Sequence, residues 1–186
     1  MDLLSTRDKR MNSILGAEVQ LLEGLRRQSL VPAACYSERR VGAADEGPQL
    51  MTNAPTVAEL DALLARSKFL AAYQFRVESC ASGECLIRAP YQAELDRPGG
   101  IVSGLTYMGA ADVAMWLAIM TLGGDGGSWV TSDLKTAFLK SARSEDILCR
   151  ARVLRAGRRT MYGTAECSNA AGDLLAHHVL SYALVK

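Results

Sequence analysis

One long apolar segment in the middle of the chain restricts its fold more than any other feature. Residues 101–122 carry a single charged side chain, Asp112, and a glycine-rich run at residues 123–127 ends the segment. About 20 apolar residues can span a bilayer, but this segment also contains Ser103 and Thr106, and strand-like segments follow it closely. We therefore predict a core helix that is buried on most of its faces.

The composition is that of a folded domain. Of the 186 residues, 49% are hydrophobic and 22% are charged, which excludes wholesale disorder and allows one domain with a sizeable core. The 21 Lys and Arg residues balance 20 Asp and Glu residues, so no basic field attracts nucleic acid or an anionic membrane. Residues 1–10 are charged throughout and precede no secretory signal. We expect a soluble, cytoplasmic protein without nucleic-acid or membrane partners.

The cysteine pattern argues against a disulfide scaffold and against a zinc module. The five cysteines form no CxxC motif and share no spacing with histidine, which favours a reducing compartment. We expect no metal and no cofactor. Cys80 and Cys85 flank a predicted hairpin turn and could approach each other, but in a reducing compartment they are expected to be free thiols. His177 and His178 are adjacent in a predicted strand, so their side chains point to opposite faces and are expected to be structural or surface groups.

The chain divides near residue 50. Residues 1–50 contain one amphipathic stretch at 11–25, followed by an irregular stretch that we interpret as loose or disordered. A predicted helix then begins, where Thr56 can form a capping box with Glu59. Residues 1–50 are therefore predicted to be a partly helical or disordered N-terminal extension, and residues 51–186 a folded domain. The extension is either an upstream reading-frame extension before a true start at Met51 or an authentic flexible arm.

Short helical and strand-like segments surround the predicted core helix. A helix is predicted at 55–67, and strands at 69–80 and 84–89 form a hairpin through residues 81–83. Four strands follow the core helix, at 129–138, 147–154, 160–168 and 174–185. Their turn-rich separators suit an antiparallel meander. The order of elements predicts an α+β fold in which an antiparallel β-sheet wraps around a long central helix.

Asp112 is the first candidate for a catalytic group. An ionised carboxylate inside an apolar helix is costly unless it is paired, hydrogen-bonded or placed at a cavity. The helix provides no Lys or Arg partner for it. We therefore predict a functional carboxylate, with a satisfied structural aspartate as the alternative.

The start of the core helix is the second candidate. Gly99 and Gly100 permit a tight turn, and Ser103, Gly104 and Leu105 would present free N–H groups at the positive end of the helix. Such donors suit a thioester carbonyl or its oxyanion; in the alternative, Ser103 is only a helix cap. The phosphate-loop patterns GxxxxGK[ST] and GxGxxG are absent.

The spacing between the two candidates predicts a shared site. Ser103 and Asp112 are nine positions apart, which corresponds to about 13 Å and about 180° on a helix. They cannot meet at one substrate atom within a single chain. If both are catalytic, the helix start of one subunit must face Asp112 of another.

Three segments resemble the PaaI-like hotdog-fold acyl-CoA thioesterases. They are RPGGIVSGLTYMGAADVAMW, WVTSDLKTAFLKSA and LRAGRRTMYGTAECSNAAGDLLAHHVLSYAL, and the resemblance covers residues 67–186. The family signature is Asn-x-x-Gly-x-x-His-Gly-Gly with Asp seven residues later. Its positions fall on Arg97, Gly100, Ser103, Gly104, Leu105 and Asp112. The acid is kept, whereas Asn, His and the second Gly are replaced, and Ser-Gly in place of His-Gly resembles a recurring subgroup.

The resemblance implies a hotdog domain and a dimer with a joined sheet and two active sites at its interface. It assigns Asp112 as general base or nucleophile, and the backbone N–H of Leu105 as the group that polarises the thioester carbonyl. Ser103 Oγ would replace the missing histidine as a donor. The dehydratase branch of the fold depends on a His–acid pair and is not expected here.

The resemblance also implies substrate-binding residues. Thr131 and Ser132 match the strand that lines the site, whereas Asp133 is new and could face solvent. Gly157 and Arg158 match a Gly-Arg turn near the CoA phosphates. Lys140 and Arg143 could add further cations, and the alternative for all these cations is simple solvation.

The resulting expectation is a cofactor-free acyl-CoA thioesterase that forms a homodimer or homotetramer. One alternative is an acyl-CoA binding or sensing module without efficient turnover. Another is a structural dimer whose N-terminal stretch at 11–25 recruits a partner. Acyl carrier protein could also replace CoA as the carrier.

Overall fold

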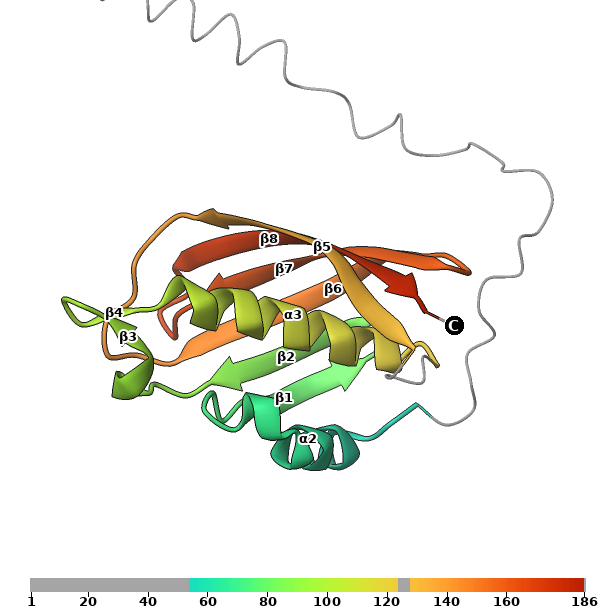
Figure 1. Ribbon diagram of the computed structural model, residues 1–186, viewed down its shortest axis with the longest axis horizontal. Helices are drawn as coiled ribbons and strands as arrows, with labels where there is room; N and C mark the ends of the chain where they lie inside the picture. Colours follow the sequence, from blue (N-terminus) through green and yellow to red (C-terminus); the bar gives the residue numbers. More distant parts are fainter. Residues whose placement is uncertain (1–53, 124–127, 186) are drawn as a thin grey trace, which may run out of the picture. The chain divides into compact units, whose positions relative to one another are not determined.

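The computed structural model describes residues 54–123 and 128–185, so the expectations for residues 1–50 lie outside the described residues. A six-stranded antiparallel sheet curves around one long helix, α3 (Gly104–Met120), as Figure 1 shows. The strands are β1 (Arg76–Ala81), β2 (Glu84–Ala89), β5 (Trp129–Phe138), β6 (Ile147–Ala156), β7 (Thr160–Ser168) and β8 (Leu174–Leu184). Their order in the sheet is β1-β2-β6-β7-β8-β5. The predicted α+β hotdog fold is confirmed.

The predicted meander of the last four strands is partly wrong. Strands β6, β7 and β8 are consecutive neighbours, but β5 pairs with β8 at one edge and β6 pairs with β2. Turn-rich separators show that the chain reverses, but they do not show beside which strand it then lies. The pairing instead follows the long register between β5 and β8, from Trp129 opposite Leu184 to Phe138 opposite Ala176.

Helix α3 begins three residues later than the apolar run in the sequence. Residues Ile101–Val102 form the short strand β4, which pairs with β3 (Asp96–Arg97). Ser103 has extended backbone angles (φ −63°, ψ 141°) and is the N-cap. The helix packs on β2, β6 and β7, so its apolar character reflects burial in the domain. Among the described residues, no helix combines the length and the hydropathy needed to cross a membrane.

A glycine on β7 lets the helix approach the sheet closely. A Cβ added at Gly163 would lie 2.5 Å from Cε of Met115 on α3 and would also collide with the backbone oxygen of Arg152. Met115 is 1% exposed in the core, together with Leu117, Ile87 and Leu180. The sheet therefore has room for α3 at this point only because residue 163 has no side chain.

The N-terminal helix of the domain is α2 (Val57–Arg66), as the sequence predicts. The Glu59 amide donates to Thr56 Oγ1 (3.3 Å), and the Thr56 amide donates to Glu59 Oε2 (2.8 Å), so the predicted capping box is confirmed. Figure 1 shows α2 beside β1. The strand predicted at 69–80 is shorter than expected, because Lys68–Leu70 form a 3₁₀ turn and β1 begins only at Arg76.

The β1–β2 hairpin has a two-residue turn and a disulfide. Ser82 (φ 52°) and Gly83 (φ 80°) both have positive φ, which suits the turn types of tight hairpins. Cys80 and Cys85 lie opposite each other in the register, with Cα atoms 4.0 Å apart, and form a disulfide. The expectation of free thiols at these positions is wrong. The cysteine count carries no information on pairing, whereas the hairpin register brings these two side chains together.

Candidate functional site

Asp112 lies midway along α3 with its side chain half-buried. Its Oδ1 atom accepts hydrogen bonds from Thr131 Oγ1 on β5 (2.5 Å) and from the Tyr182 hydroxyl on β8 (2.6 Å). Both donors are neutral, so they satisfy the carboxylate without cancelling its charge. The sequence analysis expected the Asp112 carboxylate to be paired, hydrogen-bonded or placed at a cavity. It is hydrogen-bonded, and its donors lie on two strands that follow α3 in the chain.

Tyr182 is a residue of this site that the sequence analysis missed. It is 2% exposed, and its hydroxyl also lies 2.7 Å from the backbone oxygen of Asp112. Burial, and secondarily the negative charge of Asp112, raises the pKa of Tyr182 well above its usual value. The hydroxyl therefore stays protonated and acts as a donor. In the sequence, a tyrosine in an apolar strand looks like any core residue, so no local signal marked it.

Thr131 and Ser132, which were expected to line the site together, are separated by a bulge. Thr131 is opposite Tyr182 in the β5–β8 register, and the register shifts between Thr131 and Asp133. Thr131 donates to Asp112, whereas Ser132 Oγ donates to the backbone oxygen of Ser181 (3.1 Å). Asp133 is exposed on the same strand. The bulge thus directs one of the two hydroxyls to the carboxylate.

At the start of α3, the capping role of Ser103 is confirmed. Its Oγ accepts a hydrogen bond from the backbone nitrogen of Leu105 (3.2 Å), the same amide that the family resemblance assigns to the thioester carbonyl. The Leu105 side chain is 66% exposed. Leu105 and Asp112 are seven positions apart on the helix, about 10 Å along the axis. One substrate atom therefore cannot reach both groups within one chain.

A pocket of about 320 Å³ lies beside this helix start. Its apolar lining includes Ile101, Val102, Tyr107, Phe138 and Leu139, and Arg97 and Lys140 add two cations. The Phe138 ring lies so close to Gly104 that a Cβ at residue 104 would be 3.1 Å from it. The glycine at position 104 therefore leaves room for an aromatic ring over the first turn of α3.

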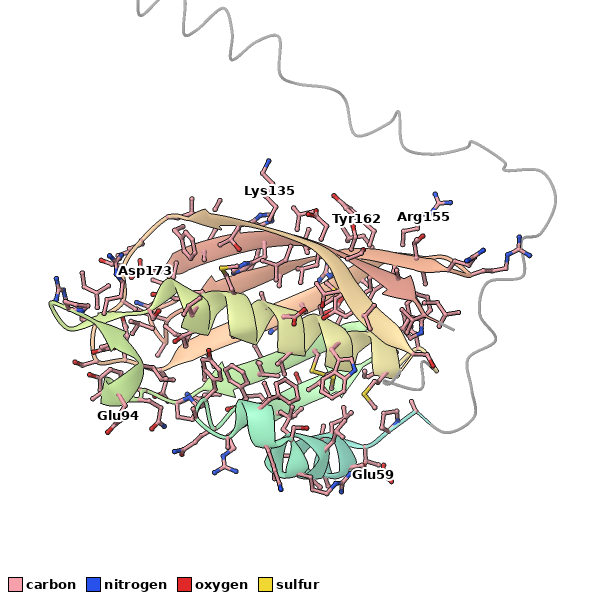
Figure 2. All side chains as sticks on the ribbon, viewed as in Figure 1. Glu59, Glu94, Lys135, Arg155, Tyr162 and Asp173 are labelled. Atoms are coloured by element: carbon pink, nitrogen blue, oxygen red, sulfur yellow. A yellow bond between two sulfur atoms is a disulfide. The ribbon has the colours of Figure 1, made fainter. Side chains whose placement is uncertain are left out.

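Two of the cations expected near CoA phosphates have partners within the chain. Lys140 Nζ forms an ion pair with Asp173 Oδ2 (2.6 Å). Arg143 donates to the backbone oxygens of Gly99 (2.5 Å) and Gly100 (3.4 Å), whose positive φ angles make the tight turn before β4. Figure 2 shows Asp173 at the end of the sheet where α3 begins. The Arg143 contacts hold the turn that precedes the start of α3.

The other expected substrate-binding residues lie at two ends of the domain. Arg97 is exposed on β3, near the helix start. Gly157 lies in the β6–β7 turn, where its amide donates to the Thr160 oxygen (2.9 Å), and Arg158 beside it is exposed. Figure 1 shows this turn at the opposite end of the sheet from the start of α3, and Arg155 marks the same end in Figure 2. One chain therefore does not bring Arg158 and the Leu105 amide together.

A second polar cluster surrounds the buried His178 on β8. His178 is 0% exposed, with Nδ1 2.9 Å from Thr136 Oγ1 and Nε2 3.5 Å from Cys167 Sγ. The Cys149 thiol lies opposite Cys167, and their hydrogen bond, together with burial, raises the pKa of Cys149 well above its usual value. His177 is half-buried, and the prediction that the two histidines face opposite sides of β8 is confirmed. Within the described part of the chain, no group of three or more His, Cys, Asp or Glu side chains could hold a metal ion.

Comparison with known proteins agrees with this geometry. Residues 99–176 match the sequence family described as the Thioesterase superfamily. A protein of Saccharolobus solfataricus named "Putative esterase" is 29% identical over 111 residues, which cover 60% of this chain and 79% of that protein.

Solved structures share the fold. Zebrafish thioesterase superfamily member 2 is 25% identical, with a TM-score of 0.63 over 70% of this chain and 99% of its own. A hypothetical thioesterase of Streptococcus pneumoniae TIGR4, solved with coenzyme A, has a TM-score of 0.58 over 62% of this chain and 90% of its own; at 16% identity, this likeness is one of fold. By sequence and by fold, the segment that holds α3, β5, β6, β7 and the start of β8 therefore matches the thioesterase superfamily.

Proposed function

We propose that this protein is an acyl-CoA thioesterase of the PaaI-like type, which hydrolyses a thioester to a carboxylic acid and CoA. The observation that carries the proposal is Asp112, a half-buried carboxylate on the central helix that two neutral hydroxyl groups hold in place. It lies at the position of the acid in the family signature. An anchored but uncompensated carboxylate is suited to take a proton from water.

In the proposed reaction, Asp112 removes a proton from a water molecule as the water oxygen attacks the thioester carbonyl carbon. The resulting tetrahedral intermediate expels the CoA thiolate as the C–S bond breaks, and the thiolate takes up the proton that Asp112 held. No metal or redox cofactor takes part. Direct attack by the carboxylate, with hydrolysis of the resulting anhydride, is the second route open to the same residue.

The start of α3 is proposed to stabilise the oxyanion. The Leu105 amide is a backbone donor, so the replacement of the family glycine by leucine leaves it in place. Ser103 Oγ accepts from this amide, which leaves the Ser103 hydroxyl proton able to point to another acceptor. A substrate carbonyl at this position would share the Leu105 amide with Ser103 Oγ and receive the Ser103 proton.

The separation of Leu105 from Asp112 leads us to propose a homodimer, or a homotetramer made of two such dimers, in which the helix start of one subunit faces Asp112 of the other. Strand β5 forms an edge of the sheet, and Val130 and Phe138 on it are 42% and 57% exposed. Leu139, which follows β5, is 57% exposed. An edge strand with exposed apolar side chains near both of its ends favours association with another chain.

Coenzyme A is proposed as the carrier of the acyl group. Its phosphates need cations, and Arg158 at the β6–β7 turn and Arg97 near the helix start are exposed. In the proposed dimer, Arg158 of one subunit can approach the helix start of the other. Coenzyme A is also the ligand named for the pneumococcal thioesterase of the same fold.

The test is thiol release from a panel of acyl-CoAs, from short aliphatic to long and aromatic, by the wild-type protein and by Asp112→Asn. We expect the variant to lose 10²- to 10⁴-fold in turnover, the usual contribution of a general base. Asp133→Asn is the matched control, because Asp133 is an exposed aspartate on β5, and it should leave turnover unchanged.

Two results would contradict the proposal. Asp112→Asn with wild-type turnover would remove the proposed base. A folded wild-type protein that binds acyl-CoA but releases no thiol from it would favour the binding or sensing module instead. Turnover with acyl carrier protein thioesters alone would keep the chemistry and change the carrier.

A further inference from the structure

Tyr182 makes two contacts with one residue 70 positions away in the chain. Its hydroxyl oxygen lies 2.6 Å from Asp112 Oδ1 and 2.7 Å from the Asp112 backbone oxygen. The first contact holds the side chain and the second holds the main chain of the same residue. Because the tyrosine ring is 2% exposed, the surrounding core holds the hydroxyl in place.

The two hydroxyls that contact Asp112 are not equivalent. Thr131 and Tyr182 are opposite each other in the β5–β8 register and reach the same atom, Oδ1, so Oδ2 receives neither bond. Thr131 is exposed on an edge strand, whereas Tyr182 is enclosed on β8. The rigid member of the pair is therefore Tyr182.

We infer that Tyr182 is a positioning residue that fixes the orientation of the Asp112 carboxylate, with Oδ2 as the oxygen that takes the proton from water. The inference rests on the proposed function of Asp112 as the base. A carboxylate bonded through one oxygen by two donors cannot rotate without breaking both bonds, so its second oxygen keeps one direction. The proton then has a single acceptor atom.

The Asp112 backbone oxygen is the second acceptor of the Tyr182 hydroxyl, and it matters when the Asp112 carboxylate is protonated. While Asp112 is ionised, the Tyr182 proton is directed to Oδ1, the stronger acceptor. When Asp112 has taken up a proton, Oδ1 becomes a weaker acceptor, and the backbone oxygen at 2.7 Å is a second one for the same proton. The buried hydroxyl therefore keeps a partner in both protonation states of Asp112, which avoids the cost of an unsatisfied buried donor.

The test compares Tyr182→Phe with Tyr91→Phe in steady-state thiol release. Phenylalanine fills the same space and removes only the hydroxyl. Tyr91 is the matched control, since its hydroxyl donates to another carboxylate, Asp96 Oδ2 (2.9 Å). Because a hydrogen bond to a charged group is stronger than one between neutral groups, we expect kcat of Tyr182→Phe to fall about 10- to 100-fold with KM unchanged, and Tyr91→Phe to keep both constants.

The same substitution in the Asp112→Asn background shows whether Tyr182 acts through Asp112. If it does, Tyr182→Phe causes no further loss there. The inference would be overturned by a Tyr182→Phe variant with wild-type kcat, by a change in KM alone, or by an equal loss in both backgrounds. If Tyr182→Phe does not fold, Tyr182→Met removes the hydroxyl with a more adaptable side chain and is judged by the same criteria.

The failure of the proposed function gives a different result. In that case Asp112→Asn itself leaves thiol release unchanged, whatever Tyr182→Phe does. A loss in Asp112→Asn without a loss in Tyr182→Phe keeps the proposed function and rejects only the positioning role.

Discussion

Ser103 Oγ lies 3.2 Å from the backbone nitrogen of Leu105 and accepts its hydrogen bond. The helix cap and the proposed donor to the thioester carbonyl are therefore neighbouring groups that share one proton. The cap depends on the serine oxygen, whereas the proposed catalysis depends mainly on the Leu105 amide, with the Ser103 hydroxyl as a second donor.

Ser103→Ala separates these two roles. We expect the free energy of unfolding to fall by about 1 kcal/mol, the usual effect of removing an N-cap side chain, as measured by denaturant unfolding. Ser103→Asn should keep the cap and serves as the control. Thiol release should fall much less in Ser103→Ala than in Asp112→Asn, because the Leu105 amide stays in place and only the second donor is lost. A loss of turnover as large as that of Asp112→Asn would instead assign the Ser103 hydroxyl as the main donor.

A methyl group at Gly163 should destabilise the domain. The added Cβ would collide with Met115 and with the backbone of β6, and overpacking of this kind costs about 1–3 kcal/mol or more. Gly109→Ala is the matched control, because a Cβ there meets the rings of Phe75 and Tyr73 only at ordinary contact distances of 3.7 Å and 3.8 Å. In the middle of α3 this change should stabilise by about 0.5–1 kcal/mol. Melting temperatures that move in the same direction for both variants would contradict the close approach of α3 to β7.

The four cysteines within the described residues should fall into two chemical groups. Cys149 and Cys167 are 0% exposed, so we expect them to resist alkylation in the native protein and to react after unfolding. Cys80 and Cys85 should stay unreactive in both states until a reductant is added, because they form a disulfide. Non-reducing peptide mapping by mass spectrometry checks this. Alkylation of Cys80 in the unfolded, unreduced protein would contradict the disulfide.

The ion pair between Lys140 and Asp173 should contribute to the acid sensitivity of the fold. The hydrogen bond from Lys140, followed by that from Asn169, lowers the pKa of Asp173. A lowered pKa in the folded state means that the stabilisation is present above the unfolded-state pKa and is lost as pH falls through the folded-state pKa. Asp173→Asn should therefore show a smaller drop in melting temperature than wild type between about pH 6 and about pH 3. An equal drop would show that the pair contributes nothing.

Local patterns predicted much of the fold. The bounds of β2, β5 and β7 agree with the predicted strands, because each is a short apolar or alternating run between turn residues. The capping box of Thr56 and Glu59 was also predictable, because its two partners are only three residues apart. Where neighbours in the chain decide the structure, the sequence is sufficient.

The pairing of segments was only partly predictable in this way. Helix α3 begins at Gly104, later than the apolar run, because Ile101–Val102 pair with Asp96–Arg97. Strand β5 lies at the sheet edge because it pairs with β8. The Cys80–Cys85 bond is local and lies across a predicted hairpin, and it was missed because the cysteine pattern favoured a reducing compartment. The start of α3 and the position of β5 both depend on which strands pair with each other. The order of residues along the chain does not state this pairing directly.

The candidate site shows the same division. The sequence by itself determined that an acidic residue, Asp112, lies in an apolar helix without a charged partner nearby, and that a glycine-containing turn precedes this helix. Only the tertiary structure decided which groups hold the carboxylate. Tyr182 and Thr131 come from strands that meet beneath α3, because sheet pairing and core packing, rather than sequence spacing, bring their hydroxyls to one oxygen atom.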